Sequence, residues 1–90
     1  NASLLRQYGI THDMFLSMLA LQGGGCAICG GLNSDGRALH VDHDHVTGEV
    51  RGLLCYKCNT MLGLSGESIL RMTDAILYLH KSRVVKARAA

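Results

Sequence analysis

Proline and tryptophan are absent from the sequence, and its 90 residues include only one phenylalanine and three tyrosines. No proline-rich or other low-complexity linker divides the chain, so its length predicts a single domain over residues 1–90. Its apolar runs are too short to cross a bilayer, which argues against a membrane-spanning segment. No basic stretch followed by an apolar one marks the N-terminus, so no secretion signal is expected. The start at Asn1 instead of methionine is compatible with a fragment or a trimmed form.

The formal net charge of +2 says little about partners. Four thiolates around one divalent cation would carry a net charge of about −2, so a metal-loaded domain would be close to neutral. The basic residues are unevenly distributed: the C-terminal segment contains Lys81 and Arg83 with no acid after them, and Arg37, Arg51 and Lys57 lie around the cysteines. This distribution is compatible with phosphate contacts, and equally with ordinary solvated side chains.

Two Cys-x-x-Cys pairs, Cys26 with Cys29 and Cys55 with Cys58, are separated by the segment 30–54. This spacing is typical of a four-sulfur zinc site. Disulfides are one alternative, but they would need an oxidising compartment, and the sequence shows no secretion signal. A redox-active Cys-x-x-Cys is another alternative, and it would need a βαβ fold around it. Because sulfur fills all four positions, the zinc would have no open coordination position, and we expect it to be structural.

Local patterns predict a small α+β domain stapled by this zinc, with the four-cysteine frame over residues 26–58. Thr11 is a suitable N-cap before apolar residues at helical spacing, and three glycines at 23–25 end that helix. Two short apolar segments around turn residues predict a β-hairpin. The predicted elements are a helix over 12–22, strands over 38–42 and 50–54, a short helix over 59–64, a long helix over 67–82, and a frayed basic tail over 84–90.

A second cluster, residues 40–45, contains three histidines and two aspartates, and Asn59 follows the last cysteine. Carboxylate and carboxamide oxygens suit Mg²⁺, and an imidazole suits a general base. Regular strand alternation would place Asp42 and His43 on opposite faces, so both serve one site only if the strand ends or bends there. Each residue also has a structural interpretation: Asp44 could cap a turn, and Asn59 could close a zinc turn.

Several stretches resemble the recombination endonuclease VII family of HNH (ββα-metal, His-Me finger) nucleases of phage type. The resemblance covers roughly residues 5–82, and its most specific parts are the His/Asp run and the Val-Arg-Gly-Leu-Leu-Cys segment. The matching stretches are Tyr8–Thr11, Gly24–Gly30, Leu39–His45, Gly48–Cys55 and Cys58–Asn59. The resemblance implies a ββα-metal finger with flanking N- and C-terminal helices.

The resemblance also implies roles for individual residues. Asp42 and Asn59 would bind a catalytic Mg²⁺ or Mn²⁺, and His43 would be the general base that activates water. His45 would lie at the scissile phosphate, with His40 in a supporting role. The four cysteines would hold structural zinc. The family pattern has an acidic residue three positions after the Asn, where this chain has a leucine, so a third carboxylate at the metal is not expected.

The resulting hypothesis is a metal-dependent HNH endonuclease that hydrolyses DNA with little sequence specificity, by nicking or by cutting both strands. Arg51, Lys57, Lys81 and Arg83 would contact backbone phosphates. The expected setting is the cytoplasm of a bacterial host, for a phage-encoded or prophage-like protein. A homodimer and proteins of phage packaging or recombination are the partners considered. The alternative is a non-catalytic four-cysteine zinc module that binds DNA or protein.

Overall fold

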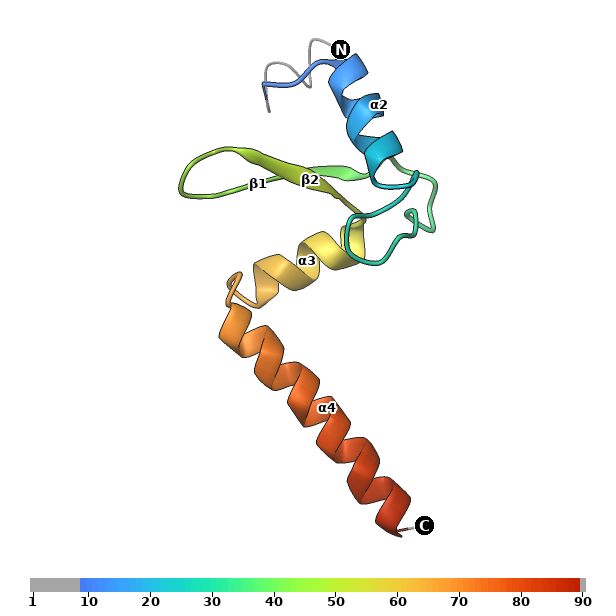
Figure 1. Ribbon diagram of the computed structural model, residues 1–90, viewed down its shortest axis with the longest axis vertical. Helices are drawn as coiled ribbons and strands as arrows, with labels where there is room; N and C mark the ends of the chain where they lie inside the picture. Colours follow the sequence, from blue (N-terminus) through green and yellow to red (C-terminus); the bar gives the residue numbers. More distant parts are fainter. Residues whose placement is uncertain (1–8, 90) are drawn as a thin grey trace. The chain divides into compact units, whose positions relative to one another are not determined.

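The computed structural model describes residues 9–89, with side chains described as far as residue 81. Over that range it contains three helices and one two-stranded antiparallel sheet (Figure 1). The elements are α2 (His12–Leu21), β1 (His40–His43), β2 (Val50–Leu54), α3 (Tyr56–Leu64) and α4 (Ile69–Ala89). This confirms the predicted α+β class. Within the described part, no helix is long and apolar enough to cross a membrane.

The chain divides into two compact units, Asn1–Thr60 and Met61–Ala90, which are described separately. The single domain expected over residues 1–90 stays a prediction. Tyr8 and the side chain of Arg83, both singled out in the sequence, lie outside the described residues.

Helix α2 begins where its N-cap predicts. The Thr11 side-chain oxygen accepts a hydrogen bond from the backbone N–H of Met14 at 3.1 Å, while Thr11 itself is extended. This satisfies one of the N–H groups that the first turn of a helix leaves without a partner. The helix ends at Leu21, one residue earlier than predicted, because Gln22 is its C-cap.

The two strands form a hairpin with a β-bulge. Asp42 pairs with Gly52, but the next pair joins His43 to Val50, so Arg51 is an extra residue on β2. A bulge bends its strand and re-aims side chains. The irregularity therefore lies between Asp42 and His43, where strict alternation would have sent the two side chains to opposite faces.

Asn33 explains why β1 and α3 differ from their predicted ranges. Its Nδ2 donates to the carbonyls of Arg37 and Ala38, each at 3.0 Å, so these groups are held by the preceding loop, and β1 begins only at His40. Its Oδ1 accepts from the backbone N–H of Tyr56 at 2.7 Å. That bond caps α3 from a distant part of the chain, and the helix begins three residues earlier than expected.

The core of the first unit is small and lies along the hairpin. Leu53 is its most buried large side chain, with 0% of its surface exposed. Around it the chain buries four further apolar residues and three of the four cysteines. These are Ile10, Leu39, Val41, Leu54, Cys26, Cys55 and Cys58.

The Gln22 amide joins the end of α2 to β2. Its Nε2 donates to the carbonyls of Gly25 at 2.9 Å and Leu53 at 3.0 Å, and its Oε1 accepts from the N–H of Leu53 at 2.9 Å. A Cβ on Gly52 would lie 3.1 Å from that Oε1. Because Gly52 has no side chain, the Gln22 amide can come close to the β2 backbone. The local sequence around Gln22 carries no signal for these long-range contacts.

In the second unit, α4 begins at Ile69, two residues later than predicted. The Ser68 hydroxyl accepts from the N–H of Arg71 at 3.0 Å, which makes Ser68 the N-cap. Glu67, with φ 57°, has a left-handed conformation that a right-handed helix does not contain. The helical backbone continues to Ala89, through most of the segment 84–90 that was expected to fray.

We expect Gln22→Leu to lower the free energy of unfolding by about 2–4 kcal/mol, because three hydrogen bonds are lost and the backbone of buried Leu53 loses partners. Urea unfolding of the zinc-loaded protein measures this. Gln22→Glu can still accept from Leu53 but cannot donate, and it should fall between wild type and Gln22→Leu. A loss below about 0.5 kcal/mol for Gln22→Leu would mean that the amide does not hold the helix to the strand.

Candidate functional site

The four cysteine sulfurs form one cluster. Cys26, Cys29, Cys55 and Cys58 place all four Sγ atoms within 4.8 Å of one another. Cys29 and Cys55 have their sulfurs 3.7 Å apart. Four sulfurs around a zinc ion, each at about 2.3 Å, would be separated by about 3.8 Å, whereas a disulfide bond measures about 2.05 Å. The cluster fits a zinc ion and could hold one.

The ionisation of the cluster also favours a bound cation. Burial works to raise the pKa of the Cys26 thiol, but hydrogen bonds from the backbones of Cys29, Cys55 and Ile28 outweigh it and lower the pKa to about 6. Burial and the neighbouring thiols raise the pKa of Cys58 to about 12. A divalent cation would favour the thiolate form at all four.

In the first cysteine turn, the backbone of Gly30 and Gly31 lies directly against Gly25. The turn is held by hydrogen bonds from Cys26 N–H to the carbonyl of Gly31 at 2.8 Å and from Gly30 N–H to the carbonyl of Cys26 at 2.9 Å. A Cβ on Gly25 would overlap the backbone carbonyl of Gly30. Only glycine fits this position while the turn keeps its shape.

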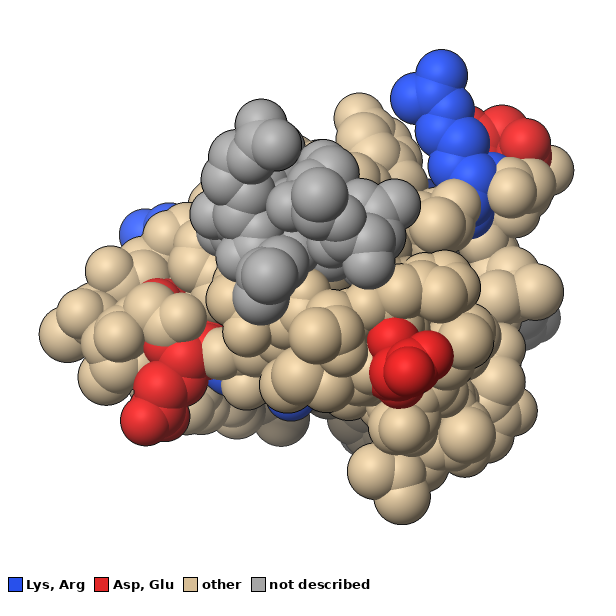
Figure 2. Space-filling model, turned by 90° about the horizontal axis from the view of Figure 1, so that it is seen from above, with Lys and Arg blue, Asp and Glu red and all other residues tan. Residues whose placement is uncertain are grey.

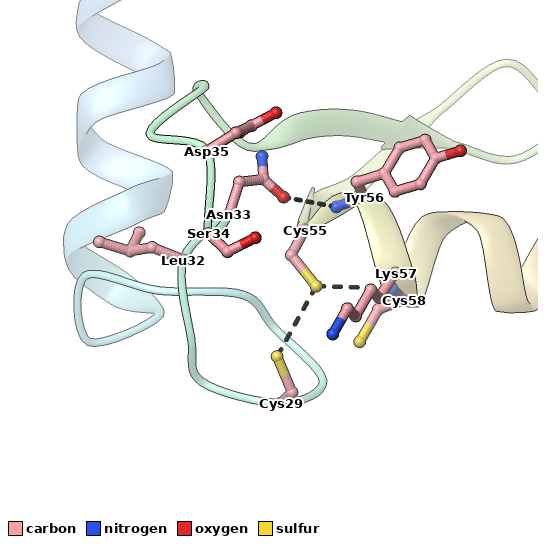
Figure 3. Close-up of a pocket in the computed structure, with 9 residues that line it drawn as sticks. All are labelled: Cys29, Leu32, Asn33, Ser34, Asp35, Cys55, Tyr56, Lys57 and Cys58. Carbon is pink, nitrogen blue, oxygen red and sulfur yellow. Dashed lines mark hydrogen bonds between the residues drawn. The ribbon is translucent and has the colours of Figure 1, made fainter.

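A pocket of about 400 Å³ lies beside the sulfurs, between residues 32–35 and 55–58 (Figure 3). Cys29 completes its lining, and a second pocket of about 220 Å³ lies against α2. Neither of these two pockets is lined by Asp42 or His43.

On the hairpin, Asp42 is bound by Arg51. Nε of Arg51 donates to Oδ2 of Asp42 at 2.8 Å, and Nη2 donates to Oδ1 at 3.1 Å. The Asp42 side chain is 12% exposed and that of Arg51 is 37% exposed, so the pair is partly shielded from water. Arg51 had been expected to contact DNA, but in this structure its guanidinium holds the carboxylate predicted to bind a metal.

The histidines of the cluster separate into two groups. The rings of His43 and His45 lie 5.3 Å apart between centroids, and Nδ1 of His43 is buried. His40 instead lies beside Tyr56, with ring centroids 6.4 Å apart. His43 and His45 are therefore neighbours, and His40 has a different ring partner.

Asp44 caps the turn between the strands. Its Oδ1 accepts from the N–H groups of Val46 at 2.7 Å and Thr47 at 2.9 Å, and its backbone N–H donates to the carbonyl of Glu49 at 2.8 Å. The hydrogen bonds from Thr47 and Val46 hold the pKa of the Asp44 carboxyl below its usual value. The turn-capping interpretation of Asp44 is thus correct.

Asn59 lies in α3, half-buried, directly after Cys58. Its backbone N–H donates to the carbonyl of Cys55 at 2.9 Å, so the second cysteine turn holds its backbone. The sequence predicts that its side chain converges with those of Asp42 and His43. The convergence of these three side chains stays a prediction.

On the face that Figure 2 shows, most of the coloured surface belongs to uncharged side chains. Lys57 is exposed and lines the pocket beside the sulfurs, and Lys81 is exposed on α4. Each is accessible to a phosphate, and their role in binding stays a prediction.

The family model described as recombination endonuclease VII matches residues 1–81. The chain belongs to the recombination endonuclease VII family. This confirms the resemblance found in the sequence and supports a nuclease role.

Two relatives of this endonuclease VII family member come from mycobacteriophages. The Gene 59 protein of Mycobacterium phage D29 is 44% identical over 84 residues, which cover 92% of this chain and 51% of that protein. The Gene 59 protein of Mycobacterium phage L5 is 47% identical over 77 residues, covering 84% and 47%. The chain thus spans about half the length of these relatives. No solved structure matches it.

Sequence reasoning missed three interactions of this endonuclease VII domain: the Gln22 bridge, the Asn33 cap and the Arg51–Asp42 pair. The first two are long-range contacts of side-chain amides, for which the local pattern carries no signal. The third had a partial signal, because antiparallel pairing of the two strands places Arg51 and Gly52 opposite Asp42.

Replacing glycine with alanine should destabilise the protein at position 25 but not at position 63. We expect Gly25→Ala to lower the free energy of unfolding by at least about 2 kcal/mol and to weaken zinc binding, because the new methyl group overlaps the turn. Gly63→Ala lies in α3 with no atom within 4 Å of the new Cβ, and it should be neutral or stabilising by up to about 1 kcal/mol.

Urea unfolding and competition with a zinc chelator measure the two effects. Wild-type zinc affinity in Gly25→Ala would contradict the claim that the glycine shapes the cysteine turn.

Proposed function

We propose that the chain is a metal-dependent HNH endonuclease that hydrolyses DNA phosphodiester bonds with little sequence specificity. The observation that carries this is the bulge between Asp42 and His43, in a hairpin that ends at the sulfur cluster. The extra residue of the bulge, Arg51 on β2, lies opposite the step from Asp42 to His43, and the cluster fixes the backbone before Asn59. Family membership supports the nuclease class, and the HNH mechanism is our inference from these residues.

The donor set around Asp42 suits a hard divalent cation. Its carboxylate is mostly shielded from water and already faces a cationic group, the guanidinium of Arg51. Together with the carboxamide oxygen of Asn59, it would hold one Mg²⁺ or Mn²⁺, leaving positions for water and phosphate oxygens. When bound, the ion would stabilise the negative charge that develops on the phosphate and its leaving oxygen.

His43 would take the proton from the attacking water as general base. The water oxygen would form the new bond to phosphorus as the bond to the 3′ oxygen breaks, which leaves 5′-phosphate and 3′-hydroxyl ends. His45, whose ring is 5.3 Å from that of His43, would lie against the scissile phosphate. Lys57 and Lys81 would contact other backbone phosphates, which gives affinity without sequence choice.

One such site cuts one strand, so a double-strand break requires either two successive nicks or a second copy of the chain. Helix α4 is a candidate surface for a second copy, because it exposes a set of large apolar side chains. These are Ile69, Leu70, Ile76, Leu77 and Leu79, each at least 60% exposed. We propose the phage-infected bacterial cytoplasm as the setting, where proteins of packaging or recombination could supply specificity.

A non-catalytic zinc module that binds DNA or protein is the second candidate. The bidentate Arg51–Asp42 pair favours it, because a carboxylate already held by an arginine need not bind a metal. The pocket beside the sulfurs, lined by Lys57 and Tyr56, would then be part of the docking surface. The two candidates differ in whether the hairpin residues do chemistry.

Plasmid nicking by the zinc-loaded protein, with and without Mg²⁺ or Mn²⁺, separates the candidates. We expect cleavage that needs the added metal and that falls about 10²–10⁴-fold in His43→Ala. His80→Ala, an exposed histidine on α4, is the matched control and should cleave normally. A linear product that rises with the square of protein concentration would indicate two copies acting together.

Near-normal nicking by His43→Ala would remove His43 as the base. No cleavage by folded, zinc-loaded wild type with either metal and several DNA forms would favour the binding module.

A further inference from the structure

The carboxylate of Asp42 has both oxygens engaged by one side chain, that of Arg51. The geometry is the fork-to-fork pairing in which a guanidinium contacts the two oxygens in parallel. This pair lies on the hairpin, at the residue to which we assign the divalent cation. A cation that binds the same oxygens must therefore share them with Arg51 or displace it.

The position of Arg51 in the fold suits displacement. Arg51 is the extra residue of the β-bulge on β2. Its neighbour Gly52 is fixed, since it is buried and closely approached by Gln22, whereas the Arg51 side chain is 37% exposed. The backbone is thus anchored beside a side chain that has access to solvent.

We propose that the guanidinium of Arg51 occupies the Asp42 carboxylate until a divalent ion displaces it. The released guanidinium then binds a phosphate of the nucleic acid. This inference rests on the proposed function. A phosphate presents the same paired oxygens as a carboxylate, so the guanidinium can exchange one for the other without a change in its own geometry. Arg51 is accordingly a positioning residue that couples metal entry to substrate contact.

The exchange has a thermodynamic consequence that a purely structural ion pair lacks. Metal binding to wild type must break the Arg51–Asp42 pair, so removing Arg51 should tighten metal binding. It should also remove a phosphate contact, so cleavage at saturating metal should fall. Tighter metal binding combined with slower cleavage is the signature of the proposed role.

Mn²⁺ binding to the zinc-loaded chain, measured by electron paramagnetic resonance of the free ion, tests the first part. We expect Arg51→Gln to bind Mn²⁺ roughly 5- to 30-fold more tightly than wild type. Nicking at saturating Mn²⁺ should fall at least about tenfold. Arg51→Lys keeps the positive charge but cannot contact both carboxylate oxygens in parallel, so it should give intermediate values. It keeps the test informative if Arg51→Gln fails to fold.

Arg37→Gln is the matched control, because it removes the same charge from another arginine–aspartate pair. Arg37 lies 3.5 Å from Asp35, and their side chains are 86% and 60% exposed. This variant should change neither Mn²⁺ affinity nor nicking. An equal change in both arginine variants would mean that net charge alone sets the affinity, and it would overturn the proposal.

Asp42→Asn distinguishes failure of this inference from failure of the proposed function. If wild type binds Mn²⁺ and Asp42→Asn does not, the metal site stands; unchanged or weaker Mn²⁺ binding by Arg51→Gln then overturns the exchange alone. If Asp42→Asn binds Mn²⁺ like wild type, or wild type shows no saturable binding, both proposals are wrong.

Discussion

The four cysteine sulfurs bring together two chain segments, 26–29 and 55–58, that are far apart in sequence. The apolar core that surrounds them is small, as expected for a chain of this length. Binding of a structural zinc ion contributes on the order of 10–16 kcal/mol in apparent terms, which exceeds the net stability of many small domains. The hairpin and the start of α3 therefore depend on the sulfur cluster for their positions.

Two side-chain amides, like the sulfurs, also hold together chain segments that are far apart in sequence. Gln22 holds the end of α2 to Leu53, and Asn33 holds the loop before β1 to the first turn of α3. Each amide satisfies backbone groups that neither a helix nor a strand would satisfy there. These contacts flank the hairpin, where the Arg51 side chain is 37% exposed.

Local chemistry predicted much of this arrangement. Local residue preferences predicted the Thr11 cap and the second strand over 50–54. The spacing of the cysteines, which is typical of a zinc site, predicted the sulfur cluster. The starts of β1 and α3 did not follow, because Asn33 sets both through tertiary hydrogen bonds. At the candidate site, the sequence predicted that the strand must end or bend at Asp42 and His43 if both are to serve one site. It predicted neither the bulge residue Arg51 on β2 nor the pairing of that arginine with Asp42.

In the proposed function, the sulfur cluster positions Asn59 to share one divalent cation with Asp42. The most direct test is Mn²⁺ affinity in Asp42→Asn and Asn59→Ala, with the cysteine site loaded with zinc and then stripped of it. We expect each substitution to weaken binding at least about tenfold in the zinc-loaded protein, since each removes one of two protein ligands. Stripping zinc should abolish binding in wild type. Wild-type Mn²⁺ affinity in Asn59→Ala, or in the zinc-stripped protein, would contradict the account.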